Sequence, residues 1–272
     1  ADYPRYMDTF GENPRGIHAT ALLTGTHDVT MASLITKAFD SYLPAFARQL
    51  PILIADYDAL PANDPLRPRL KGQIAMLRDW DYRWGVASMP TSLAVFWGDT
   101  LWDKASKADT AEGLSIYDYM AEKAGAKARL QALAEASDRL QKDFGNWGTP
   151  WGEINRFQRV NGDIVQPFDD AKPSIPVPFV SSRWGSLASF GAHRWPGTKR
   201  YYGTSGNSFV AVVEFGPKVH ARAITAGGES GHPDSPHFND EAERYTTGNL
   251  RTVYFWPEQL KGHTERVYHP GG

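Results

Sequence analysis

The sequence has 272 residues, of which 41% are hydrophobic and 22% are charged, and its formal net charge is -2. This balance is typical of a globular protein with a sizeable core, and it excludes the strongly basic surface that nucleic acids and anionic membranes require. The sequence contains no cysteine, which excludes disulfide bonds, a thiolate nucleophile and zinc sites built on sulfur.

The chain begins with Ala1-Asp2-Tyr3-Pro4, without an initiator methionine and without Ser, Thr or Cys at position 1. No run reaches the roughly 18 apolar residues that a membrane-spanning helix needs. No signal peptide is recognisable at the start. We therefore expect any signal sequence of a parent protein to lie upstream of this segment.

Residues 1–145 are predicted to be mainly helical. Asn13 directly precedes Pro14, so it can cap a helix whose first-turn proline loses no needed hydrogen bond. Gly25 follows the apolar stripe of this helix and is placed to end it.

Apolar residues at spacings of three and four predict the further helices. Residues 42–59 have the same character, with breaks predicted at Pro44 and Pro51 because proline removes a helix hydrogen bond. The other predicted helices cover residues 31–40, 66–80, 91–106 and 126–144.

Residues 146–272 are predicted to be rich in strands. Runs of β-branched and aromatic residues at 208–215 and 219–224 flank a Gly-Pro-Lys turn, which predicts an antiparallel hairpin. A short helix at 240–247 and a strand at 251–255 follow. The predicted fold class is therefore α+β, with a helical first half followed by antiparallel strands in one structural unit.

Arg15 lies in the first turn of the first predicted helix, where the helix dipole disfavours a cation. An arginine in such a place is often held by a specific acceptor, such as a carboxylate, a carbonyl or an Asn oxygen; the alternative is a solvated surface arginine. His18 lies near the apolar stripe, where a hydrogen-bonded core histidine is the alternative to a catalytic one.

A second segment, Trp147 to Phe157, contains two Trp-Gly pairs around a proline. Such a stiff aromatic loop can form a wall of a substrate groove, with Trp147 and Trp151 as the candidate residues. It can equally be a hinge between the two halves of the chain.

A third segment, Gly227 to Asp240, is rich in His, Asp, Ser and Pro. A metal site at His232 and His237 is one interpretation, but the prolines prevent the helical His-Glu-x-x-His arrangement. A Ser-His-Asp triad from Ser230 or Ser235 is another, although no Gly-x-Ser-x-Gly elbow is present. The third is a structured turn held by its own polar side chains.

The third segment, with the Tyr, Gly, Leu, Arg and aromatic residues that follow it up to Phe255, resembles the C-terminal end of the penicillin acylase family. The run Asn13-Pro14-Arg15-Gly16 and the run Trp151-Gly152-Glu153-Ile154-Asn155-Arg156 resemble two further landmarks of that family, in the expected order. The resemblance is closer to the aculeacin and acyl-homoserine-lactone acylase branch than to penicillin G acylase itself.

The resemblance implies an N-terminal-nucleophile hydrolase with an αββα core, of which this chain is the C-terminal part of the large subunit. In that family a self-cleaved precursor exposes a residue, usually Ser, whose own α-amino group is the general base. An unperturbed α-amino pKa of about 8 suits that role. An Asn side chain and a backbone N–H stabilise the oxyanion.

The resemblance also implies roles for residues of this chain. The nucleophile and the oxyanion Asn are expected upstream, so the chain supplies no catalytic nucleophile. Arg15 matches the family arginine that orients the oxyanion Asn. Glu229, with His232 nearby, is the candidate for a supporting Glu that some cephalosporin-acylase relatives use. No cofactor and no metal are implied.

The function expected from the resemblance is hydrolysis of linear amides to a carboxylic acid and an amine, in antibiotic or signal-molecule acyl removal. The chain alone is expected to be inactive, and its partners are the small subunit and the upstream part of the large subunit. A periplasmic or secreted bacterial location is implied. The alternative is a non-catalytic module that binds a peptide or glycan in an aromatic groove.

Overall fold

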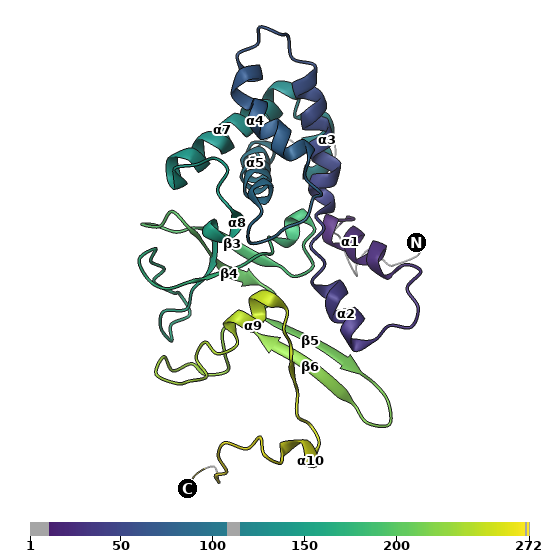
Figure 1. The fold of residues 1–272 in the computed structure, drawn as a ribbon, viewed down its shortest axis with the longest axis vertical. Helices are drawn as coiled ribbons and strands as arrows, with labels where there is room; N and C mark the ends of the chain where they lie inside the picture. Colours follow the sequence, from purple (N-terminus) through teal and green to yellow (C-terminus); the bar gives the residue numbers. More distant parts are fainter. Residues whose placement is uncertain (1–10, 108–114, 270, 272) are drawn as a thin grey trace.

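The computed structural model describes residues 11–107, 115–269 and 271 of the chain. Helices α3, α4, α5 and α7 gather at one end of the molecule, strands occupy the middle, and the C-terminal segment extends from the other end (Figure 1). Helices come first in the sequence and strands later, which confirms the predicted α+β class. Residues Ala1 to Pro4, on which the expectation about a signal sequence was based, lie outside the described residues.

The helices of the first half agree closely with the sequence prediction. Asn13 caps the first helix by accepting a hydrogen bond from the backbone N–H of Gly16 at 3.0 Å. The helices are α1 (Pro14–Leu23), α2 (Met31–Ala38), α3 (Pro44–Asp58), α4 (Leu66–Arg78), α5 (Met89–Ala105), α6 (Ile116–Asp118) and α7 (Ala126–Phe144), with a π-helical turn at Tyr119–Lys123.

Helix α3 runs without interruption through Pro51, so the break predicted there is wrong. Pro51 is exposed, and a proline on the solvent face of a helix frees a carbonyl that water can satisfy. The opposite face carries Phe46, Leu50 and Leu53, all fully buried. Their burial stabilises the helix on both sides of the proline.

Helix α5 lies in the middle of the helical end (Figure 1). It is apolar on several sides and therefore buried rather than amphipathic. Gly98 allows a close approach to the 3-10 turn Ser182–Trp184, because a Cβ at this position would lie 2.8 Å from the Trp184 ring and 3.1 Å from Phe46. The Phe46 and Trp184 rings stack with centroids 4.8 Å apart.

Within the described residues, the second half forms two small sheets, of which the first was not predicted. It has strand order β2-β1-β4-β3 and contains β1 (Asn155–Phe157), β2 (Ile175–Pro176), β3 (Phe190–Arg194) and β4 (Tyr201–Gly206). Strands β1 and β4 run parallel and the other pairs are antiparallel, so one parallel pair accompanies the predicted antiparallel strands. Strands β1 and β2 have only three and two residues, which is too short for the alternation of apolar and polar residues that predicts a strand.

The second sheet has strand order β5-β6-β7. Strands β5 (Phe209–Glu214) and β6 (His220–Thr225) form the predicted antiparallel hairpin, which confirms that prediction. The strand predicted at 251–255 is shorter, as β7 (Arg251–Thr252), and the helix predicted at 240–247 begins two residues later, as α9 (Ala242–Thr247). The remaining short helices are α8 (Trp151–Ile154) and α10 (Pro257–Leu260).

Both halves of the chain contribute to both hydrophobic cores. The first core lies among α3, α4, α5 and α7 and includes Trp151, Trp184 and Tyr201 from the second half. The second core joins the two sheets, and α2 packs against it through Leu34 and Phe39. None of the helices in the described part of the chain is long and apolar enough to cross a bilayer.

Candidate functional site

Arg15 is held by specific acceptors rather than being a solvated surface residue. Its Nη2 donates to the carbonyl oxygen of Leu187 at 2.8 Å and lies 3.4 Å from Oδ1 of Asn207. The same Asn207 oxygen accepts the backbone N–H of Ser189 at 2.7 Å. Arg15 therefore ties the start of α1 to the segment before β3 and to the turn between β4 and β5.

His18 is a hydrogen-bonded histidine of the core. Its ring is 3% exposed, with Nδ1 2.8 Å from the carbonyl oxygen of Gly185 and Nε2 3.0 Å from Oδ1 of Asp40. Asp40 also accepts from Nη1 of Arg83 at 3.2 Å and from the backbone N–H of Tyr42 at 2.9 Å. These contacts join α1 and α2 to the helical end and give His18 a structural role.

Acid should weaken this junction. Burial alone would raise the pKa of Asp40, but hydrogen bonds from Tyr42, Arg83 and His18 outweigh it and hold that pKa below its ordinary value. A lowered folded-state pKa contributes stability that is present above the unfolded pKa and is lost as the pH falls through the folded pKa. The free energy of unfolding of Asp40→Asn should therefore fall short of wild type at pH 7, with the gap closing as the pH falls below about 4. Urea unfolding of both proteins at pH 7 and at a pH below about 4 measures this difference in the free energy of unfolding. An equal difference at the two pH values would contradict the stabilising role of the Asp40 carboxylate.

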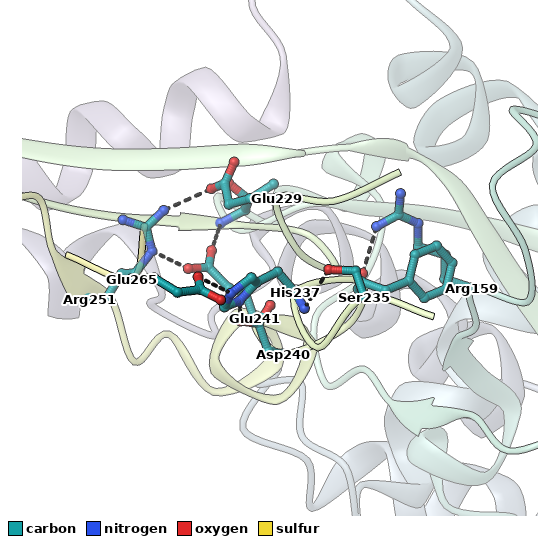
Figure 2. Close-up of polar contacts among 10 residues, drawn as sticks. Arg159, Glu229, Ser235, His237, Asp240, Glu241, Arg251 and Glu265 are labelled. Atoms are coloured by element: carbon teal, nitrogen blue, oxygen red, sulfur yellow. Dashed lines mark hydrogen bonds and ion pairs between the residues drawn. The ribbon is translucent and has the colours of Figure 1, made fainter. Parts of the chain in front are cut away.

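The third segment forms a loop that is bonded to itself between β6 and α9. The backbone N–H of Ser230 donates to His237 O at 3.0 Å, and that of Glu241 donates to Gly227 O at 2.8 Å. Arg159 reaches in from the end of β1, donating to Phe238 O at 2.7 Å (Figure 2). The structure thus favours the structured-turn interpretation of this segment.

Two carboxylates meet at Arg251 on one side of this loop, as Figure 2 shows. Glu229 accepts from Nη2 of Arg251 at 2.8 Å and from the hydroxyl of Thr225 at 2.8 Å. Glu241 accepts from Nε of Arg251 and from the backbone N–H of Thr225. Glu241 is 7% exposed at its side chain and Glu229 is 57% exposed, so the buried member of the pair is Glu241. The sequence had marked only Glu229.

The histidine that meets acidic groups in this loop is His237. Its Nδ1 lies 2.9 Å from Asp240 and its Nε2 lies 3.1 Å from Glu265. Hydrogen bonds to Asp240 and then to Glu265 raise the pKa of His237 above its ordinary value. His232 is exposed; its backbone N–H donates to Ser230 Oγ at 3.1 Å, and its backbone carbonyl accepts the N–H of Ser235 at 3.0 Å.

The metal and triad interpretations are not assembled in this loop. Over residues 11–107, 115–269 and 271, no group of three or more His, Asp or Glu side chains is arranged to hold a metal ion. The hydroxyls of Ser230 and Ser235 accept backbone N–H groups of His232 and His237 rather than contacting an imidazole.

Gly228 is required for the close packing of the loop. A Cβ at this position would lie 2.3 Å from His237 O and 2.8 Å from Oδ1 of Asp240. Gly228→Ala should lower the free energy of unfolding by about 2 kcal/mol, the usual range for forced overpacking. Gly231→Ala is the matched control, since a Cβ there meets nothing within 4 Å. Thermal unfolding compares the two variants, and equal losses would contradict the prediction.

The two tryptophans proposed for a substrate groove occupy different places. Trp151 begins α8, is 3% exposed, and lines a cavity of about 600 Å³. Trp147 is not among the residues that line this cavity; it packs half-buried on α4, 3.2 Å from where a Cβ of Gly72 would lie. None of the nine tryptophans is fully exposed. The binding-module alternative needs an open surface lined by tryptophan, and these tryptophans do not form one.

Sequence reasoning missed Asn207 and Glu241. The run Gly206-Asn207-Ser208 indicates only a turn, and nothing in it indicates a contact with a residue 192 positions away. Glu241 was assigned only to the first-turn dipole of a helix, although it also pairs with Arg251.

Comparison with known proteins places these features in a family context. A family model described as penicillin amidase matches residues 1–262. Among solved structures, a thermostable penicillin G acylase from Alcaligenes faecalis is similar to 94% of this chain at 14% identity, with a TM-score of 0.49. The match covers 52% of that acylase, so the chain spans about half its length.

Proposed function

The chain belongs to the penicillin amidase family, and we propose that it is part of a longer amidohydrolase that cleaves linear amides to a carboxylic acid and an amine. The observation that carries this proposal is the family match over residues 1–262. The acyl group would be removed from an amine-bearing nucleus such as a β-lactam, a homoserine lactone or a cyclic lipopeptide. The parent protein would act in the periplasm or outside the cell.

In the proposed reaction the nucleophile is the first residue of the large subunit, upstream of this chain. Its α-amino group takes the hydroxyl proton, the oxygen attacks the amide carbonyl, and an Asn side chain with a backbone N–H stabilises the oxyanion. Expulsion of the amine leaves an acyl-enzyme, which water hydrolyses. On this account the chain positions catalytic groups without itself containing the nucleophile.

Arg15 is the residue of this chain that we propose as a positioning group for the oxyanion Asn. Its Nη2 is bound by Leu187 and Asn207, while its Nε and Nη1 have no acceptor among the residues that the structure describes. A guanidinium fixed through one nitrogen keeps its other N–H groups in a rigid fork. The N–H groups on Nε and Nη1 can therefore bind and orient an Asn side-chain oxygen of the upstream segment.

Glu229 and His232 are proposed as supporting residues of the same assembly. Glu229 fixes the third segment through Arg251 and Thr225, which supports a positioning role rather than direct proton transfer. His232 is exposed on the same loop, where it can face the upstream segment.

The missing part of the precursor is the partner that we propose for this chain. Strand β5 is the edge of its sheet, and the hairpin exposes Phe209 by 61% and Phe215 by 83%. Unpaired strand edges beside exposed aromatic rings favour association with another chain. The C-terminal segment exposes two further aromatic residues, Phe255 by 69% and Tyr268 by 68%.

Fragment complementation tests the proposal. The 272-residue chain, co-expressed with the upstream part of its precursor as a separate polypeptide, should restore hydrolysis of phenylacetyl or long-chain acyl chromogenic amides. The upstream part expressed alone should be inactive. Full activity of the upstream part without this chain would contradict the proposal, because the fold would then be complete without it.

A further inference from the structure

A cavity of about 600 Å³ lies between the helical end and the first sheet. It is lined from α5 by Asp99, from α7 by Arg139, and from the α8–β1 segment by Trp151 and Asn155. Tyr201 of β4 contributes an aromatic wall. This volume is within the range of small-molecule sites, which are mostly apolar with a few placed polar groups.

Two deeply buried polar atoms that belong to lining residues have no hydrogen-bond partner. They are Nε1 of Trp151, a donor, and Oδ1 of Asn155, an acceptor; the two residues are 3% and 1% exposed. The amide nitrogen of Asn155 is bound by the carbonyls of Val177 and Phe179, which fixes the direction of its oxygen. Buried polar groups in proteins are normally paired, so an unpaired donor and an unpaired acceptor in two residues that line one cavity indicate an occupant.

Arg139 adds a cation to the same cavity, where Asp99, Asp143 and Asp103 attract it without pairing with it. Its guanidinium carbon lies 4.3 Å from the ring centroid of Phe96 and 5.7 Å from that of Tyr201. It makes no hydrogen bond or ion pair with any residue that the structure describes. Stacking fixes the plane of a guanidinium while leaving its N–H fork directed outward, the geometry that binds a carboxylate.

The charged neighbours of Arg139 make their ion pairs with other residues. Arg194 is paired with Asp143 at 3.4 Å, and Arg183 lies 3.5 Å from Asp99. Burial raises the pKa of Asp99 to about 6, against the attraction of Arg183 and Arg139. With that pKa, Asp99 is still mostly ionised at pH 7, so it opposes the binding of an anion. The lining holds three arginines, Arg139, Arg183 and Arg194, and two aspartates, Asp99 and Asp103.

We propose that this cavity is a binding site for a small aromatic carboxylate that carries a second polar group able to donate and accept a hydrogen bond. The carboxylate binds Arg139, the ring packs on Tyr201, and the second polar group satisfies Trp151 and Asn155. This binding goes beyond the proposed amide hydrolysis, and its test does not depend on it.

Calorimetric titration of the 272-residue chain with 4-hydroxybenzoate tests the proposal, with 4-hydroxybenzamide and 4-hydroxybenzylamine as neutral and cationic probes of the same shape. The acid should bind and the amine should not. Arg139→Gln should weaken the acid at least about tenfold, the loss expected for one charged hydrogen bond. Arg69→Gln is the matched control, because Arg69 is an exposed arginine of α4 outside the cavity.

Two further variants distinguish a built site from damage to the fold. Trp151→Phe removes the Nε1 donor together with part of the buried ring, so two ligands are compared to isolate the donor. The variant should weaken 4-hydroxybenzoate severalfold more than it weakens benzoate. Asp99→Asn removes the opposing charge and should tighten the acid at pH 7, which a damaged cavity would not do. Equal binding of the acid and the amide, unchanged binding by Arg139→Gln, or no binding of the acid at about 10 mM would overturn the proposal.

Discussion

Replacing Arg15 with Met in the assembled amidohydrolase should lower kcat about 100-fold with little change in KM. Loss of one oxyanion-hole donor costs about that much in other hydrolases, and Arg15 is proposed to hold such a donor in place. The guanidinium itself is fixed by Leu187 and Asn207. Steady-state kinetics on a chromogenic amide measures kcat and KM separately.

The matched control is Arg48→Met, which removes an arginine of α3 that is 49% exposed and paired only with carboxylates on the surface. It should leave kcat unchanged. If Arg15→Met reduced thermal stability but kept the wild-type kcat, Arg15 would be a structural anchor of α1 and no more. Because a loss of folded enzyme would also lower the apparent kcat at unchanged KM, the rate is divided by the concentration of folded enzyme, measured by circular dichroism.

Replacing Glu241 with Ala should lower the free energy of unfolding by about 3 kcal/mol. The carboxylate is 7% exposed and is the acceptor for both Arg251 and the backbone N–H of Thr225. Removing one member of a buried pair leaves the other groups without a partner, which costs about 3–5 kcal/mol when both are buried. The lower figure applies because Arg251 is 38% exposed. Urea unfolding followed by tryptophan fluorescence measures the loss.

Glu229→Ala provides the comparison, because Glu229 binds the same Arg251 from a position that is 57% exposed. Exposed ion pairs are worth up to about 1 kcal/mol, so this variant should lose much less stability. Equal losses in the two variants would mean that burial of Glu241 does not decide the energetics of this loop.

The helices could be predicted because their signals are local. The Asn13 cap, the first-turn proline and the apolar spacing act within one or two turns, and α1 and α7 begin and end close to where these signals place them. The β5–β6 hairpin is equally local. Pro51 shows the limit: its effect depends on which face of α3 is buried, and that is decided by residues elsewhere in the chain.

The first sheet and the candidate sites could not be predicted in the same way. The parallel pairing of Asn155 with Tyr201 joins segments separated by two other strands. A specific acceptor for Arg15 was one of two interpretations of the sequence, and its partners Leu187 and Asn207 follow only from tertiary packing. Arg139 and Asp99 lie on ordinary helices without a motif, and only the folded cavity brings them together.

We propose that this chain is part of an amidohydrolase whose nucleophile lies outside it. The most direct measurement is amide hydrolysis by the purified 272-residue chain and by its full-length precursor product, with phenylacetyl and long-chain acyl chromogenic amides. We predict activity only in the full-length protein, abolished when the first residue of its large subunit is changed to Ala. Hydrolysis by the 272-residue chain alone would place the nucleophile within it and contradict the account.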